Sequence, residues 1–188
     1  MNKIALCVAA CCAAAFSAAR TPSVSHVDAI WDAANDRMSQ QIENWFSDGD
    51  FPALISVLGF QFSLDPSNYD VATNLGWMQE NIHEWDKALA TYVKYSEENP
   101  KDPDRTLPLA DFYYREKAYA KIPSILEPML ACKPHPHPNV FRILAHAYEK
   151  QHLYGDAKRV YLAYIAIAPA DGAAKANLAR LERLIKGS

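Results

Sequence analysis

The chain has 188 residues, 50% of them hydrophobic and 22% charged, with a formal net charge of −3. This composition is typical of a globular protein, and the small negative charge argues against nucleic acid as a partner. Only six glycines occur, which argues against glycine-rich phosphate loops and a turn-rich β-sandwich. The chain has no Gly-x-Ser-x-Gly, His-Glu-x-x-His, Walker or Cys-x-x-Cys motif. We therefore expect no enzymatic activity, no catalytic residues and no cofactor.

Residues 1–19 have the features of a secretory signal peptide. They begin with the basic residue Lys3, continue with an alanine-rich apolar run over 4–16, and end in Ser17-Ala18-Ala19. We expect cleavage after Ala19 and export of the mature chain, which would be periplasmic or secreted. The apolar run is too short for a membrane-spanning helix, and we expect no transmembrane segment in the mature chain.

The leader allows two alternatives to cleavage after Ala19. Val8-Ala9-Ala10-Cys11 resembles a bacterial lipoprotein cleavage box, which would leave a lipid anchor, and an uncleaved leader would itself be an anchor. Three of the four cysteines lie in the leader, so the mature chain keeps Cys132 alone. Because one cysteine cannot form an internal disulfide, packing must supply the stability.

Four prolines are spaced 34, 34 and 35 residues apart: Pro66, Pro100, Pro134 and Pro169. Alignment on them places an aromatic residue at one position of every unit, at Phe51, Trp85, Tyr119 and Tyr154. A small or apolar residue recurs at two others, namely Ile42, Gly76, Ala110 and Ala145, then Leu54, Ala88, Ile122 and Ala157. A period near 34 with this pattern indicates stacked helical hairpins, because one hairpin alone cannot bury its apolar face.

The chain here resembles the tetratricopeptide repeat (TPR) family, most clearly in the unit with Leu75-Gly76, Trp85, Ala88, Tyr92 and Pro100. The resemblance implies an all-α, right-handed superhelical solenoid of about four hairpins. We place an N-terminal helical extension at 20–34, with a long first helix that starts near Ser23–Ser25. The repeats are assigned to 35–68, 69–102, 103–136 and 138–171, and a capping helix and tail to 172–188.

Repeat three departs from the pattern because Pro123 and Pro128 fall where its second helix should run. Pro123 can lie in a first turn, whereas Pro128 removes a backbone hydrogen bond, at a cost on the order of 3 kcal/mol. We predict a kinked or shortened helix there.

The loop after this helix carries a thiol and two imidazoles, at Cys132, His135 and His137. These groups could ligate copper or zinc, but the alternating prolines hold the two histidines on opposite sides and no fourth ligand is evident. We therefore favour a stiff inter-repeat loop, with metal binding as an alternative. Cys132 aligns with the apolar Leu64 and Ile167, which favours a packed thiol over the alternative, a covalent dimer through Cys132.

The TPR resemblance implies that the first helices of successive hairpins line a concave groove that binds peptides or partner helices. Its groove positions correspond here to Glu43, Phe46, Trp77, Glu80, Asn81, Asp111, Tyr114, Arg115, Arg142, His146, Glu149, Lys150, Arg180 and Arg183. Phe46, Trp77 and Tyr114 would form an aromatic stripe, which is typical of binding anchors. The early end of the groove is acidic and the late end basic. The alternative is that these residues are ordinary solvated helix faces.

We favour a non-catalytic adaptor or scaffold that binds an extended or helical segment of another protein in the cell envelope. The polarised charge predicts a partner of complementary polarity and a salt-sensitive association. The main alternative is a structural protein that self-associates into a homo-oligomer and whose groove binds nothing.

Overall fold

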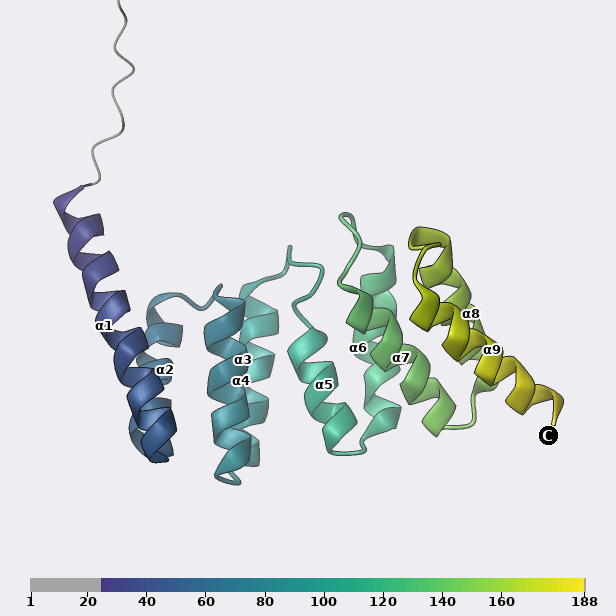
Figure 1. Cartoon of the computed structure of the whole chain (residues 1–188), viewed down its shortest axis with the longest axis horizontal. Coiled ribbons are helices and arrows are strands. Elements are labelled where there is room, and N and C mark those ends of the chain that lie inside the picture. Colours follow the sequence, from purple (N-terminus) through teal and green to yellow (C-terminus); the bar gives the residue numbers. More distant parts are fainter. Residues whose placement is uncertain (1–24, 188) are drawn as a thin grey trace, which may run out of the picture. The chain divides into compact units, whose positions relative to one another are not determined.

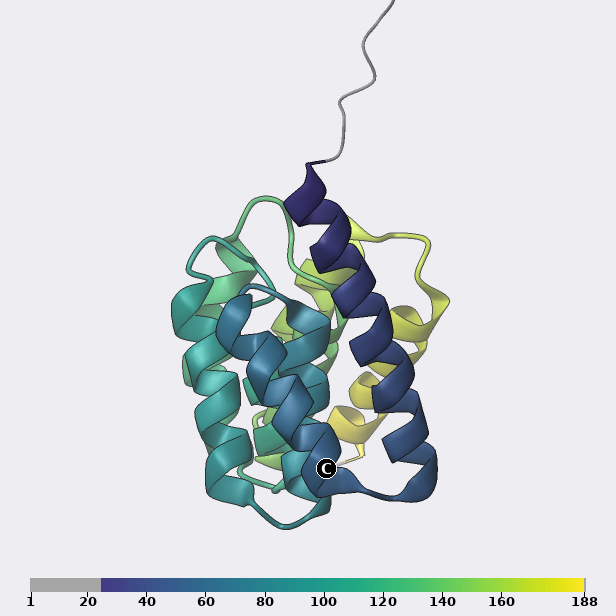
Figure 2. The same ribbon diagram turned by 90° about the vertical axis from the view of Figure 1, so that its left-hand side faces the viewer.

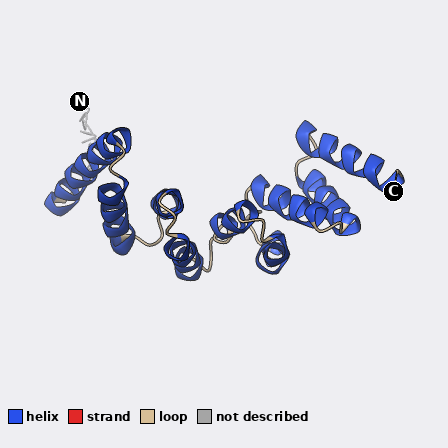
Figure 3. Ribbon diagram, turned by 90° about the horizontal axis from the view of Figure 1, so that it is seen from below, coloured by secondary structure: helices blue, strands red, loops and turns tan. Residues whose placement is uncertain are grey.

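The structure, a computed structural model, describes residues 25–187. The predicted signal peptide at 1–19, with its three cysteines, lies outside the described residues, as do residues 20–24 of the predicted extension. The chain divides into two compact units, with the boundary between Gln40 and Gln41. All regular secondary structure in the described range is helical (Figure 1, Figure 3).

Helix α1 (His26–Asp48) begins in the first unit and has a capping box at its start. The Ser25 hydroxyl accepts the amide N–H of Asp28, and the Asp28 carboxylate accepts the amide N–H of Ser25. No residue of α1 is buried, and Val27, Ile30 and Trp31 are 73%, 65% and 42% exposed. This helix therefore presents an apolar face with helical spacing to solvent.

The second unit consists of helices in antiparallel pairs that follow one another along the chain (Figure 1, Figure 2). The C-terminal part of α1 is followed by α2 (Phe51–Leu64), α3 (Tyr69–Asn81) and α4 (Trp85–Glu98). Next come α5 (Leu107–Arg115), α6 (Ile122–Leu126), α7 (Pro138–Lys150), α8 (Tyr154–Ile167) and α9 (Gly172–Lys186). The hairpin partners α3 and α4 pack together, as do α7 and α8, and α2 packs on α3 and α8 on α9. This order is the all-α solenoid that the 34-residue period predicts.

Each hairpin turn contains one residue with a left-handed backbone, at the same position of every repeat. The φ angles are 75° at Gly49, 64° at His83, 58° at Lys117 and 61° at His152. Only the first is a glycine, the residue that adopts this conformation without strain. The three other turns therefore carry a side chain in an unfavourable backbone conformation.

Small residues allow the two helices of a hairpin to approach closely, as the repeat pattern predicts. Ala88, Ala110, Ala145 and Ala157 are fully buried. At Gly76 the approach leaves no room for a side chain, because a Cβ there would lie 2.3 Å from Cζ of the buried Tyr92. The Tyr92 ring therefore occupies the space that a side chain at position 76 would need.

The second helix of repeat three is interrupted, which confirms the prediction from Pro123 and Pro128. Helix α6 has only five residues, with the 3₁₀ segments Tyr119–Lys121 and Glu127–Ala131 on either side. Pro123 lies in the first turn of α6, and Pro128 lies in the first turn of the second 3₁₀ segment. Ile122, Leu126 and Met129 are nevertheless buried, so the interrupted segment still supplies core side chains.

Candidate protein-binding groove

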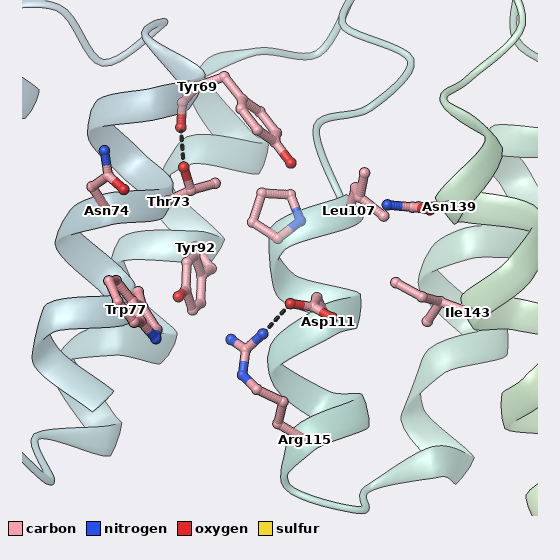
Figure 4. A pocket seen from close by; sticks show the side chains of 11 residues that line it. Tyr69, Thr73, Asn74, Trp77, Tyr92, Leu107, Asp111, Arg115, Asn139 and Ile143 are labelled. Carbon is pink, nitrogen blue, oxygen red and sulfur yellow. Dashed lines mark hydrogen bonds and ion pairs between the residues drawn. The ribbon is translucent and has the colours of Figure 1, made fainter. Parts of the chain in front are cut away.

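The first helices of three successive hairpins, α3, α5 and α7, line a pocket of about 360 Å³ (Figure 4). We call it the central pocket, and its lining residues are Tyr69, Thr73, Asn74, Trp77, Tyr92, Leu107, Pro108, Asp111, Arg115, Asn139 and Ile143. Trp77, Asp111 and Arg115 are among the residues expected on the groove. The structure thus brings together side chains from three repeats on the face formed by first helices.

Two aromatic side chains of the central pocket, Trp77 and Tyr69, are solvent-accessible and contact other rings. Trp77 is 46% exposed, and its ring centroid lies 6.3 Å from that of Phe46, which is 50% exposed. The Tyr69 ring packs edge-on against Tyr95, with centroids 5.7 Å apart. Ring contacts of this kind restrict the side chains while leaving apolar surface for a ligand.

Tyr114, the third member of the predicted aromatic stripe, lines a separate pocket of about 340 Å³ between α5, α7 and α9. The other lining residues of this α7–α9 pocket are His146, Glu149, Lys150 and Arg180, all expected on the groove. Tyr114 also packs edge-on against Tyr119, with centroids 5.2 Å apart. Two members of the stripe, Trp77 and Tyr114, therefore line different pockets, and Phe46 lines neither of them.

Glu80, which the sequence places on the groove, is only 7% exposed and connects two hairpins. Its carboxylate accepts the Tyr92 hydroxyl at 2.7 Å, Arg115 Nη2 at 2.6 Å and Arg115 Nε at 3.0 Å. Burial alone would lower the pKa of Arg115, but the hydrogen bond to Glu80 and the negative charges of Asp111 and Glu80 together outweigh it, so the pKa is raised. Burial, and then the hydrogen bond to Glu80, raise the pKa of Tyr92. Arg115 also pairs with Asp111.

The same arrangement recurs 69 residues later, two repeats along the chain. The Glu149 side chain, 10% exposed, accepts the Tyr161 hydroxyl at 2.9 Å and Arg180 Nη2 at 2.6 Å and 2.8 Å. His146 Nδ1 lies 3.4 Å from a Glu149 oxygen, and burial is the main cause of the lowered pKa of His146. Repeats one and three have Leu58 and Leu126 at the tyrosine position, so only alternate repeats form this connection.

These connections change which charges the groove offers to a partner. Glu80, Arg115, Glu149 and Arg180 neutralise each other in pairs. Asp111 pairs with Arg115, and His146 lies within ion-pair distance of Glu149. The other charged residues predicted on the groove, Glu43, Arg142, Lys150 and Arg183, form no ion pair with any of the residues 25–187. Six of the predicted groove residues line neither of the two pockets: Glu43, Phe46, Glu80, Asn81, Arg142 and Arg183.

Several lining residues of the central pocket were not predicted on the groove from the sequence: Tyr69, Thr73, Asn74, Leu107, Pro108, Asn139 and Ile143. The repeat register contains a signal for three of them, because Asn74, Pro108 and Ile143 occupy one repeat position, 34 and 35 residues apart. That position lies one helical turn before Trp77 and Asp111, on the same face.

A third pocket of about 360 Å³ adjoins the central one and shares Tyr69, Leu107 and Asn139 with it. We call it the acidic pocket, and its remaining lining residues are Asp102, Asp104 and His137. The Asp104 carboxylate accepts the backbone N–H of His137 at 2.5 Å, which connects the start of repeat three to the start of repeat four.

The Cys132 loop shows local contacts instead of a ligand cluster. Cys132 is half-buried against the core, and His137 Nδ1 accepts the backbone N–H of Asn139 at the start of α7. His135 Nε2 lies 2.8 Å from Lys133 Nζ. In the part of the chain that the structure describes, no three His, Cys, Asp or Glu side chains are grouped to hold a metal ion.

None of the helices in the described part of the chain is both long enough and apolar enough to cross a membrane.

No protein-family model matches the sequence, and no curated protein matches it. Solved structures do match. The chain is similar to a tetratricopeptide repeat protein from Parabacteroides merdae, with a TM-score of 0.63 and 18% identity, over 81% of this chain and 60% of that protein. It is also similar to the MamA protein, with a TM-score of 0.59 and 16% identity, over 79% of this chain and 80% of MamA. These similarities show the TPR fold and confirm the prediction of an all-α solenoid.

Proposed function

From the TPR fold and its central pocket, we propose that the protein is a non-catalytic scaffold that binds a segment of another protein along α3, α5 and α7. The observation that carries this proposal is the central pocket, in which an exposed tryptophan and side chains from three repeats line one concavity. Aromatic anchors in such a setting contribute strongly to protein interfaces. The neighbour named as a tetratricopeptide repeat protein supports a binding role by analogy of fold.

The polarity of the unpaired charges supports a partner segment with a direction. Arg142, Lys150 and Arg183 lie on α7 and α9, whereas Asp70 and Asp104 lie on or near α3 and α5. A segment of complementary polarity would bind in one orientation, and its association would weaken with added salt.

We also propose that the protein acts in the cell envelope after export. This part of the proposal rests on residues 1–19, whose basic start, apolar run and small final residues are typical of a signal peptide. Cell fractionation, with mass spectrometry of the N-terminus, tests it. A mature chain that starts at Arg20 in the periplasmic or culture fraction is expected, and an intact Met1 in the cytoplasmic fraction would contradict export.

The binding role is tested with affinity capture from an envelope extract, using three baits in parallel. The wild-type chain is compared with Trp77→Ala and with the matched control Trp85→Ala, whose indole is 40% exposed but lies outside the central pocket. We expect a protein that the wild type and Trp85→Ala capture and that Trp77→Ala loses. Equal capture by all three baits would show that the central pocket is not the binding site.

Self-association is the second candidate function, and the exposed apolar face of α1 favours it. An Ile30→Ser substitution removes the centre of that face without touching the groove helices. Under this alternative, sedimentation velocity shows an oligomer whose population rises with concentration and falls in the Ile30→Ser variant. A monomer at all concentrations would contradict self-association.

A further inference from the structure

The central and acidic pockets together form one continuous surface, because they share Tyr69, Leu107 and Asn139. Its floor in the central pocket is apolar: Trp77, Leu107, Pro108 and Ile143 come from three different helices (Figure 4). A volume of about 360 Å³ accommodates a large apolar side chain of a ligand. The first requirement on an occupant is therefore an aliphatic or aromatic anchor.

Two carboxamides border this apolar floor, Asn74 from α3 and Asn139 from α7. Neither side chain makes a hydrogen bond to another of the residues 25–187, although each carries a donor and an acceptor. The N–H and C=O groups of an extended backbone offer the complementary acceptor and donor. The second requirement is therefore a peptide backbone that crosses the pocket in an extended form.

The rim of the surface is acidic. The lining residues of the two pockets include three carboxylates, Asp102, Asp104 and Asp111, and one guanidinium, Arg115, which gives a net charge of −2 with His137 neutral. Arg115 is already held by Glu80 and Asp111, whereas Asp102 and Asp104 form no ion pair with any described residue.

The same carboxylates also affect the pKa of the Tyr69 phenol. Burial raises its pKa first, and the charges of Asp104, Asp111, Asp102 and Asp70 raise it further. Four carboxylates therefore act on one aromatic ring that is itself 38% exposed. A cation placed against the face of this ring would gain both from the ring and from the carboxylates.

Resting on the function proposed above, we propose that the partner segment is an extended basic and apolar peptide. An aliphatic or aromatic side chain fills the central pocket, and a neighbouring lysine or arginine lies over Tyr69 toward Asp104. An acidic segment or a phosphorylated one is excluded from this end of the groove, because its charge would meet Asp102 and Asp104, while Arg115, the cationic lining residue of the two pockets, is already held by Glu80 and Asp111. Acidic side chains further along the segment would instead reach Lys150 and Arg183.

The test is selection from a phage-displayed library of random dodecapeptides on the purified protein. The Kd of each enriched peptide is then measured by fluorescence anisotropy with a labelled copy. We expect the enriched peptides to share an aliphatic or aromatic residue next to Lys or Arg. Trp77→Ala should raise their Kd about tenfold or more, whereas Trp85→Ala should leave it unchanged. Asp104→Asn, which keeps an oxygen to accept the His137 N–H, and the exposed Asp70→Asn should each raise Kd about threefold and reduce its salt dependence.

The outcomes separate this inference from the proposed function. Enriched peptides that are acidic or neutral, and that Trp77→Ala releases, would overturn the basic and apolar assignment while leaving the groove as the binding site. Enrichment that Trp77→Ala does not affect, or no enrichment at all, would contradict both. A Kd that is unchanged in Asp104→Asn and Asp70→Asn would remove the acidic rim from recognition.

Discussion

The contact between Gly76 and Tyr92 leads to a quantitative prediction for Gly76→Ala. A methyl group at position 76 would lie 2.3 Å from Cζ and 2.4 Å from Cε1 of Tyr92, whereas ordinary contact begins at 3.4 Å. The ring would have to move by roughly 1 Å, and it is only 2% exposed. Such a movement stretches the 2.7 Å hydrogen bond from the Tyr92 hydroxyl to Glu80.

Opposing effects determine how much Gly76→Ala changes the free energy of unfolding. Overpacking costs about 1–3 kcal/mol, and a weakened hydrogen bond to a charged group adds about 1 kcal/mol. Alanine is favoured over glycine inside a helix by about 1 kcal/mol, which offsets part of this loss. We therefore expect Gly76→Ala to reduce the free energy of unfolding by about 2 kcal/mol, measured by urea denaturation and circular dichroism at 222 nm.

A rescue variant tests the cause. Leucine occupies the Tyr92 position in repeats one and three, so Tyr92→Leu is a substitution that this fold already accommodates. In the Tyr92→Leu background the clash is gone, and Gly76→Ala should be neutral or stabilise by up to about 1 kcal/mol. If Gly76→Ala stabilises the wild type, or costs the same in both backgrounds, the steric argument is wrong.

Three further predictions concern stability. Arg115→Met leaves the buried Glu80 carboxylate with only the Tyr92 hydroxyl as a partner, so it should reduce the free energy of unfolding by about 2 kcal/mol after allowance for the partial exposure of Arg115. In a Glu80→Gln background the same substitution should cost under about 1 kcal/mol, and equal costs in the two backgrounds, measured by chemical denaturation, would refute the pairing. The raised pKa values of Tyr92 and Tyr161 favour the folded state below the ordinary tyrosine pKa of about 10. Stability should therefore fall above pH 10, by up to about 1.4 kcal/mol per pH unit for each tyrosine, and absorbance at 295 nm should show them ionising only on unfolding. Lys117→Gly relieves a φ of 58° and should raise the free energy of unfolding by about 0.5–1 kcal/mol, and an unchanged denaturation midpoint would contradict this.

The fold was predictable because the same types of residue recur at the same positions of successive repeats. Small residues such as Gly76 and Ala145 recur at the helix contact, and prolines recur at the hairpin ends. A register found in one unit therefore predicts the others. The shortened α6 was predictable for a related reason, since Pro128 cannot donate the backbone hydrogen bond that a continuous helix requires.

The orientation of the groove charges was not predictable from helical spacing alone. Glu80 and Glu149 occupy positions that spacing assigns to the exposed face, but each has a tyrosine 12 residues later whose hydroxyl reaches the carboxylate. The arginine that completes each connection comes from the following hairpin in one case, 35 residues away, and from the single helix α9 in the other, 31 residues away. Because these two offsets differ, no fixed repeat position identifies the arginine.

The central claim, that the face formed by α3, α5 and α7 binds a protein segment, is tested most directly by photo-crosslinking in living cells. A photoreactive phenylalanine analogue replaces Asn74 in the central pocket and, as the control, Leu162, which is 48% exposed on α8 outside all of the pockets described above. We expect a cross-link to one partner protein from position 74, lost in the Trp77→Ala background, and none from position 162. A cross-link from position 162 alone would contradict it.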